Sequence, residues 1–274
     1  MEIALSPAMV SFMASVDWQR PWLASILGHA QAIVAAPDWR VALNEAAIRS
    51  ALRNHRGLPL RFVAQSDLPT GLAYEEFIST TGNVPTRDNL HDVFNALVWL
   101  SFPKIKRQLN LLQATEIARD AKGQGGAGTR GKQRDGATIF DENAALLIAS
   151  DPGLISMLQN HDWQAAFLQK RALFGSAWEV CLFGHALMEK LVKPYKAITG
   201  HAWVVHVPTS YFAKTADQKR EWLDDAISCQ IAFGFGTANL TPLPILGVPG
   251  WWPGQDSEFY RDAAVFRPKR ASTA

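Results

Sequence analysis

His91 and Asp92 form a histidine–aspartate pair within a segment that is expected to be helical. Asn95 follows His91 by four residues, so the two side chains lie on the same side of a helix. An imidazole, a carboxylate and an amide within two turns could bind a divalent metal ion or form a base with its orienting partner. The alternative is a solvated polar face, which most amphipathic helices have. Trp99 falls on the same face and favours a partly covered cluster, whose polar groups would need partners.

A second histidine, His185, is followed one helical turn later by Glu189. On a helix both side chains project from one face, and the preceding Gly184 would allow another backbone or a ligand to approach closely. The spacing is compatible with metal binding, but it lacks the second histidine of the zinc protease motif. The alternative is a core histidine whose ring is hydrogen-bonded to Glu189 or to a backbone carbonyl.

Asp141 and Glu142 are adjacent acids among apolar residues, and they could be metal ligands or part of a salt-bridged turn. If residues 138–150 begin a strand rather than a helix, the two side chains face opposite sides and only one serves a given site. Basic side chains elsewhere could hold an anionic substrate and the charge that develops on it. The residues expected in this role are Arg87, Lys104 and Arg134.

Together these residues suggest a metal-dependent hydrolase that acts on an anionic, phosphate-ester substrate. The expected metal ligands are imidazoles and carboxylates, drawn from His91, Asp92, His185, Glu189, Asp141 and Glu142. Such ligands fit zinc, manganese or iron better than calcium. A bound divalent ion would lower the pKa of a water molecule and produce hydroxide near neutral pH. The expected catalytic residues are His91, Asp92, Arg87 and Asn95.

The alternative is a binding protein without turnover. The formal net charge of +2 conceals a basic segment, residues 104–134, in which eight basic residues face only two acids. This segment could lie on the phosphates of a ligand or a nucleic acid, or contact a protein partner. It contains no aromatic residue, whereas proteins that bind single strands interleave aromatic residues with basic ones, so nucleic acid is not the favoured partner. A third interpretation gives the polar residues only a structural role between helices.

The elements that must position these residues begin with a helix over residues 85–103. Asp88 or Asn89 can cap this helix and Pro103 ends it. Its apolar stripe has the spacing of a core-facing helix and consists of Leu90, Val93, Phe94, Leu97 and Val98. Residues 104–118 are expected to continue as a second helix.

Further elements follow from spacing and caps. The sequence predicts a helix over 38–56 with Asp38 as its cap and a buried stripe of Val41, Ile48 and Leu52. It also predicts a helix over 178–192, a strand over 201–207 and a helix that begins with a capping box at Thr215.

Two segments rich in glycine or proline are expected to lack regular structure. Residues 119–137 contain six glycines and are expected to form a mobile surface loop. Residues 242–254 contain four prolines, so we expect an extended ribbon that Trp251 and Trp252 anchor. The chain as a whole is expected to be one helix-dominated α+β domain, with a helical N-terminal part over 1–57 and a frayed tail over 269–274.

Four separated segments, followed by a fifth short one, give the chain a family resemblance. They run in order over residues 84–110, 134–147, 183–201, 242–254 and 260–268. This pattern resembles the bacterial family called domain of unknown function 3025, over residues 58–268. The resemblance implies a shared fold and site but no particular reaction, because the family name carries none. The linker before Arg134 is longer and richer in glycine than the turn associated with the family.

Composition excludes several classes of protein. Only 19% of the residues are charged and 48% are hydrophobic, which argues against a disordered chain. No apolar run is long enough for a membrane-spanning helix, and the N-terminus lacks the basic start of a secretory signal. Two cysteines suit a reducing compartment, so we expect a cytoplasmic protein. The ten tryptophans are the unusual count and suggest a well-packed body.

Overall fold

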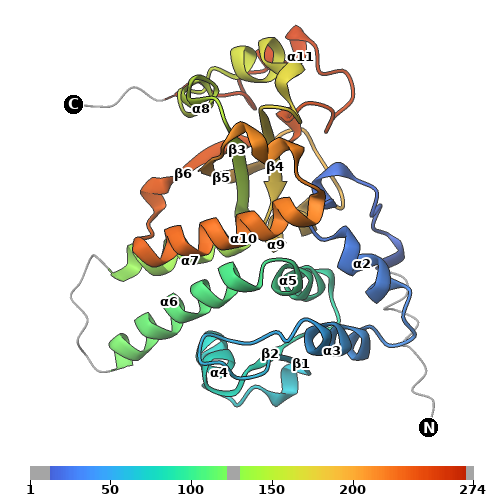
Figure 1. Cartoon of the computed structure of the whole chain (residues 1–274), viewed down its shortest axis with the longest axis vertical. Coiled ribbons are helices and arrows are strands. Elements are labelled where there is room, and N and C mark those ends of the chain that lie inside the picture. The colour runs from blue at the N-terminus through green and yellow to red at the C-terminus, as the bar shows by residue number, and fades with distance from the viewer. Residues whose placement is uncertain (1–12, 122–129, 270–274) are drawn as a thin grey trace.

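The computed structural model describes residues 13–121 and 130–269, and a mixed four-stranded sheet lies at its centre (Figure 1). The strand order is β4-β3-β5-β6, with β3 and β5 parallel in the middle and an antiparallel strand at each edge. The strands are β3 (Ala144–Ala149), β4 (Trp178–Leu182), β5 (Thr199–His206) and β6 (Leu240–Pro244). The expected helix-dominated α+β class is thereby confirmed.

The sequence of each strand matches its place in the sheet. β3 reads AALLIA and all of its residues are buried, as expected for a strand that is covered on both faces. β6 contains Pro242 and Pro244, which cannot donate to a neighbouring strand, and it lies at an edge. The proline-rich segment thus starts as an edge strand, continues as irregular chain, and is anchored by the buried Trp251.

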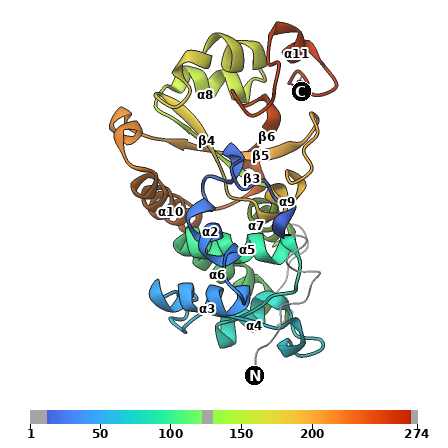
Figure 2. The same cartoon turned by 90° about the vertical axis from the view of Figure 1, so that its right-hand side faces the viewer.

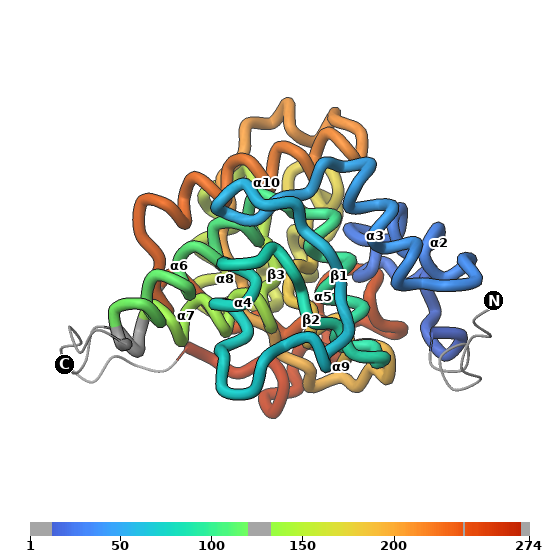
Figure 3. The backbone as a smooth tube through the Cα atoms, turned by 90° about the horizontal axis from the view of Figure 1, so that it is seen from below, coloured from blue at the N-terminus to red at the C-terminus, as the bar shows by residue number. Residues whose placement is uncertain are grey.

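Helices cover the sheet and extend below it in Figure 1. The helices nearest the sheet are α7 (Arg130–Asn143), α9 (His185–Lys190) and α10 (Ala216–Phe233). On the side of these helices away from the sheet lie α5 (Leu90–Ser101) and α6 (Pro103–Ala121). Farther from the sheet lie α3 (Trp39–Arg49), α4 (Tyr74–Thr81) and a small parallel sheet of β1 (Arg61–Val63) and β2 (Asn83–Pro85), which are in front when the molecule is seen from below (Figure 3). In the described part of the chain, no helix combines the length and apolarity that a membrane crossing requires.

The remaining elements are short. At the opposite end of the molecule lie α8 (Pro152–Gln159) and α11 (Ser257–Arg261), and α2 (Leu27–Val34) packs near α5 (Figure 2). Single turns are η1 (Pro21–Leu23), η2 (Gln65–Asp67), the π-helical η3 (Ala165–Gln169), η4 (Arg171–Leu173), η5 (Thr209–Ala213), η6 (Thr237–Asn239) and η7 (Ile245–Gly247).

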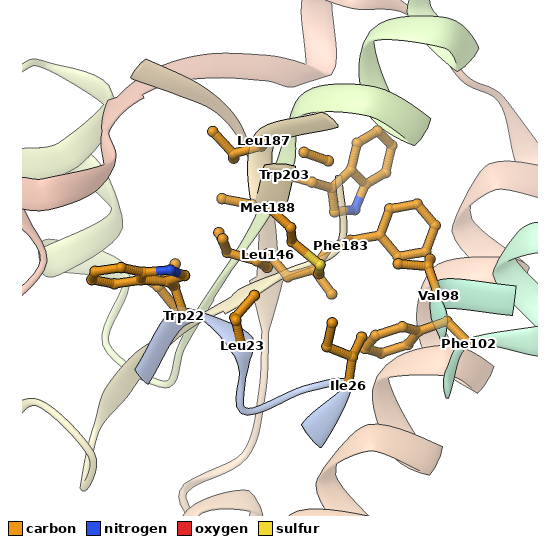
Figure 4. Close-up of a cluster of buried hydrophobic side chains, with 14 of the residues drawn as sticks. Trp22, Leu23, Ile26, Val98, Phe102, Leu146, Phe183, Leu187, Met188 and Trp203 are labelled. Atoms are coloured by element: carbon orange, nitrogen blue, oxygen red, sulfur yellow. The ribbon is translucent and has the colours of Figure 1, made fainter. Parts of the chain in front are cut away.

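One hydrophobic cluster joins the N-terminal segment to the sheet and the helix layer. Figure 4 shows Ile26 beside Phe102 of the α5–α6 junction, with Phe183 of the β4–α9 junction close by and Trp22 at the other side of the cluster. Phe102 and Phe183 meet edge to face with ring centroids 5.5 Å apart. Burying each such side chain stabilises the fold by roughly 1.5–3 kcal/mol, so this cluster fixes both junctions firmly.

Two helix predictions are wrong in extent. The helix predicted over 38–56 ends at Arg49, and Val41 and Ile48 are 53% and 74% exposed instead of buried. The segment predicted as a helix over 178–192 is the strand β4 followed by α9. Burial alternates along β4, with every second side chain covered, which is the period of a strand.

The glycine-rich stretch is more helical than predicted. α6 continues to Ala121 and α7 begins at Arg130. The prediction of a mobile loop over 119–137 is therefore wrong at both of its ends. Residues 122–129, the first 12 residues and residues 270–274 of the expected frayed tail lie outside the described residues. α7 ends at Asn143 and β3 starts at the next residue, which places Asp141 and Glu142 on a helix and not on a strand.

Candidate functional site

The first turns of α5 and α9 bring His91 and His185 together, although the two residues are 94 positions apart in the chain. The Nε2 atoms lie 3.1 Å apart, and the rings meet edge to face with centroids 4.6 Å apart. Asn89 fixes the start of α5, because its side chain accepts a hydrogen bond from the backbone N–H of Asp92. The structure therefore juxtaposes the two histidines that the sequence singles out.

The outer nitrogen of each ring is held by a hydrogen-bond acceptor. His185 Nδ1 lies 2.8 Å from the backbone carbonyl oxygen of Asp141, and His91 Nδ1 lies 2.9 Å from Glu189 Oε2. Carbonyl and carboxylate oxygens only accept, so Nδ1 carries the proton in each neutral ring. Both Nε2 atoms then present lone pairs to each other, with no hydrogen between them.

The environment keeps His185 neutral near pH 7. Burial lowers the pKa of His185 to about 4, and the ammonium of Lys106 adds to this effect. Two lone pairs at 3.1 Å repel each other unless a positive species lies between them. A proton shared between the rings, or a metal ion that both imidazoles bind, would relieve this repulsion.

A buried ion pair lies next to the histidines. Lys106 Nζ on α6 donates to both carboxylate oxygens of Asp141 on α7, at 2.6 and 2.8 Å, and to Asn95 Oδ1 on α5 at 2.9 Å. Burial alone would raise the pKa of Asp141, but the Lys106 ammonium outweighs it and the pKa is lowered. The ammonium also lies 5.2 Å from the ring centre of the buried Trp99. These contacts tie three helices together and keep Asp141 ionised.

Tyr74 and Glu75 at the start of α4 complete the polar network. Asn95 Nδ2 donates to the Tyr74 hydroxyl at 3.1 Å, which leaves the hydroxyl proton free to point towards a ligand. Burial raises the pKa of Tyr74 well above its ordinary value, so this hydroxyl remains a donor. Burial also raises the pKa of Glu75, which accepts a hydrogen bond from Asn110 at 2.7 Å.

Arg87 and Asp92 form an ion pair at the N-terminal end of α5. Asp92 Oδ2 accepts from the backbone N–H of Arg87 at 2.6 Å and from Nε at 3.0 Å, and Oδ1 accepts from Nη2 at 2.9 Å. Asp92 is almost fully buried, whereas 57% of the Arg87 side chain is exposed. Asp92 therefore aims the Arg87 guanidinium outwards, and both of its oxygens are already engaged.

These groups surround a cavity of about 400 Å³. Its lining comes from residues 65–75, α5, α6, α7 and the start of α9, and consists of Gln65, Leu68, Ala73, Tyr74, Glu75, Arg87, His91, Asp92, Asn95, Gln113, Ile117, Arg134, Thr138, Asp141, Glu142 and His185. The volume lies within the usual range for small-molecule sites, and the polar lining suits a polar ligand.

The acids that were expected to bind a metal have different positions. Within the described residues, no three His, Cys, Asp or Glu side chains form a set that could hold a metal ion. Asp92 is held by Arg87, and Asp141 is held by Lys106. Glu189 lies behind His91, as the partner of its outer nitrogen. The structure thus gives these three acids the role of holding other side chains.

Glu142 is the acid that remains available at the cavity. Its side chain lines the cavity, and its carboxylate has no partner among the residues that the structure describes. Asp141 and Glu142 are neighbours on a helix, so both reach the same cavity, which a strand would not have allowed.

The basic residues of segment 104–134 differ in where their side chains lie. Lys104 pairs with Asp225 on α10 and is not among the residues that line the cavity. Lys106 is buried with Asp141, while the exposed Arg134 lines the cavity. The side chains of the basic residues Lys122, Arg130 and Lys132 lie outside the described part of the chain.

Gly184 allows the start of α9 to come close enough to α7 for His185 to reach the cavity. A Cβ atom at Gly184 would lie 2.5 Å from the backbone nitrogen of Ala144 and 2.6 Å from the carbonyl oxygen of Glu142. The β4–α9 junction therefore crosses the α7–β3 junction with backbone against backbone. The close approach suggested by the sequence is made by another part of the chain.

Sequence reasoning missed Lys106, Tyr74 and Glu75 as members of the site. In the sequence Lys106 stands out only as one charge of the basic segment 104–134. A signal was present, because Lys106, Asn110 and Gln113 recur at helical spacing along one side of α6. Tyr74 and Glu75 had no such signal, since nothing local links the start of α4 to α5.

Comparison with known proteins places the chain in a family. No curated protein and no solved structure matches this sequence. One family model matches residues 60–270, which include every residue of the cavity described above. The chain therefore belongs to the family described as protein of unknown function (DUF3025).

Proposed function

We propose that this protein is a metal-dependent hydrolase whose active site is the cavity around His91 and His185. The observation that carries the proposal is the pair of Nε2 atoms at 3.1 Å, each on a ring whose other nitrogen is already held by an acceptor. Histidines that bind metals have this second interaction almost without exception, because it fixes the tautomer and the orientation of the ring.

The spacing of the two nitrogens agrees with a shared ion. Two imidazoles bound to a tetrahedral zinc ion at about 2.0–2.1 Å have nitrogens about 3.3 Å apart, close to the separation found here. The two histidines do not form a three-ligand set with any described acid as the structure stands. The proposal therefore requires the Glu142 side chain, which lines the same cavity and is unpaired in the described part of the chain, to turn towards the ion when it binds. A catalytic ion needs only three protein ligands, because substrate or water takes the remaining position. Such an ion would supply hydroxide near neutral pH.

The substrate class follows from the remaining charges. Asp92 and Asp141 are neutralised by Arg87 and Lys106 and would not repel an anion. Arg134 is exposed at the cavity and has no partner among the described residues, and Arg87 is fixed in its outward direction by Asp92. Arginine donors of this kind suit a phosphate group, so a phosphate ester is the proposed substrate.

Turnover of model esters tests this function. The protein loaded with zinc, manganese or iron is offered p-nitrophenyl phosphate, bis(p-nitrophenyl) phosphate and p-nitrophenyl acetate. We expect hydrolysis of a phosphate ester that His91→Ala abolishes and that the matched variant of an exposed histidine, His206→Ala, retains. Arg134→Gln should raise KM with little change in kcat. Hydrolysis of none of the three esters, or equal hydrolysis by His91→Ala, contradicts the proposal.

A further inference from the structure

A second cavity of about 370 Å³ lies at the open edge of the sheet, beside β4. Its walls come from η1, β4, η5 and the start of α10, and it shares no lining residue with the first cavity. It is therefore an independent site, and the proposed hydrolase function does not depend on it.

The backbone of Val180 offers an unpaired donor and acceptor at this cavity. Phe183 N–H donates to Ala144, and Ser150 N–H donates to Ala177, so the odd-numbered residues of β4 bond to β3. The even-numbered residues turn their N–H and C=O groups to the open edge. Neither outward group of Val180 has a partner among the described residues, and the residue lines the cavity.

The carbonyl oxygens at the neighbouring positions of this edge are already covered. The carbonyl oxygen of Trp178 accepts from the N–H of Gly175 at 2.7 Å, and that of Leu182 accepts from the Ser25 hydroxyl at 2.9 Å. Val180 is thus the position of this edge whose carbonyl oxygen remains uncovered. It can pair with the donor and acceptor on either side of one Cα in a small ligand, while the covered carbonyls beside it disfavour an extended strand.

The walls of the cavity are apolar and aromatic. Trp22 and Trp251 both line it, with ring centroids 6.1 Å apart, and Phe174 and Leu223 add to the apolar surface. A flat or branched apolar group would bury its surface between these side chains.

The charged groups of the cavity leave one cation free. Glu179 is satisfied, because it accepts from Lys219 at 2.7 Å and from the Tyr211 hydroxyl at 3.0 Å. Arg220 pairs with Asp217. The ammonium of Lys214 has no partner in the described part of the chain and lines the cavity. The site therefore complements a negative charge.

We propose that this cavity binds a small apolar carboxylate that carries an amide, the chemistry of an N-acyl amino acid. The amide N–H donates to the C=O of Val180, and the carboxylate, on the other side of the same Cα, accepts from the N–H of Val180 and meets Lys214. The apolar group lies against Trp22 and Trp251. Each part of the ligand thus has a partner in the cavity.

Calorimetric titration with three related compounds tests this proposal. N-acetyl-L-phenylalanine is expected to bind, whereas its methyl ester lacks the charge and should bind about tenfold more weakly. 3-Phenylpropionate lacks the amide and should also lose about tenfold. In Lys214→Gln the acid should lose its advantage over the ester.

Two tryptophan substitutions on α10 locate the binding. Ala216→Trp adds a large side chain at an exposed lining position and should abolish binding, while Ala232→Trp, exposed on the same helix away from the cavity, should not. No binding of the acid, equal binding of acid and ester, or binding that survives Ala216→Trp overturns the proposal. His91→Ala should leave binding here unchanged, so failure of one proposal is distinguishable from failure of the other.

Discussion

At the scale of single residues, the partners of each histidine decide what the pair can do. Two imidazoles facing each other could share one hydrogen bond, and the site would then be a simple structural contact. The acceptors at the outer nitrogens exclude this for neutral rings, because both protons are used there. Glu189 and the Asp141 carbonyl therefore matter as much as the histidines themselves.

Replacing Glu189 tests this view of the tautomers. In Glu189→Gln the side-chain amide can donate to His91 Nδ1, which moves the ring proton to Nε2 and places it between the two histidines. Metal affinity should fall by about 10–100-fold. Competition titration of zinc against a chromophoric chelator measures the change, and long-range nitrogen NMR reports the tautomer. The exposed neighbour Lys190→Gln is the control, and equal affinities of the two variants would refute the assignment.

The two cysteines should differ sharply in reactivity. Burial raises the pKa of Cys181 to about 12, while Cys229 is exposed. The thiolate is the reactive form, so Cys181 stays a slow-reacting thiol until the pH approaches 12. With a disulfide reagent at pH 8, we expect a fast phase that belongs to Cys229. The fast phase should vanish in Cys229→Ser and persist in Cys181→Ser, and the opposite pattern would contradict the assignment.

At the scale of elements, the site depends on the relative positions of α5, α6 and α7 and on the contact between the β4–α9 and α7–β3 junctions. Lys106 joins α5, α6 and α7 through its bonds to Asn95 and Asp141. Gly184 brings the start of α9 against the end of α7. A substitution at Lys106 or Gly184 would therefore separate His185 from His91 even though both histidines are unchanged.

Gly184→Ala should therefore damage both the fold and the site. The new methyl group would meet backbone atoms at 2.5–2.6 Å, and backbone cannot move aside as a flexible side chain can. We expect a loss of about 1–3 kcal/mol in the free energy of unfolding, together with weaker zinc binding. Gly28→Ala is the control, because open space surrounds Gly28 and alanine favours helix. Urea unfolding measures both, and equal stability of the two variants would contradict the crossing of the junctions.

At the scale of the whole molecule, local patterns predicted the elements better than their partners. The caps at Asp38 and Thr215 are present as predicted. Four of the five residues of the stripe predicted for α5 are buried, but so is every other residue from Asp92 to Ser101, because the helix is covered on all sides. The prediction of a helix over 178–192 is wrong because a short apolar run does not distinguish a buried strand from a buried helix. The alternation of burial that identifies β4 depends on β3, which lies about 30 residues earlier in the chain.

The candidate site shows the same limit. The sequence predicts that His91 and His185 belong to one site, and in the fold their rings are in contact. It also offered Asp92 and Asp141 as ligands, since an acid close to a histidine is a plausible ligand. Nothing local reveals that Lys106 neutralises Asp141 from 35 positions away. Long-range pairing of charges therefore decides which acids remain available for chemistry.

Metal binding by the purified full-length chain tests the central claim most directly. Metal-free protein is titrated with zinc, and the bound ion is counted by elemental analysis after gel filtration. We expect one ion per chain in the wild type and in His206→Ala, and none in His91→Ala or in His185→Ala, with circular dichroism spectra that show all four proteins folded. A wild-type chain that binds no zinc, manganese or iron, or an ion that remains in His91→Ala and His185→Ala, would contradict the account.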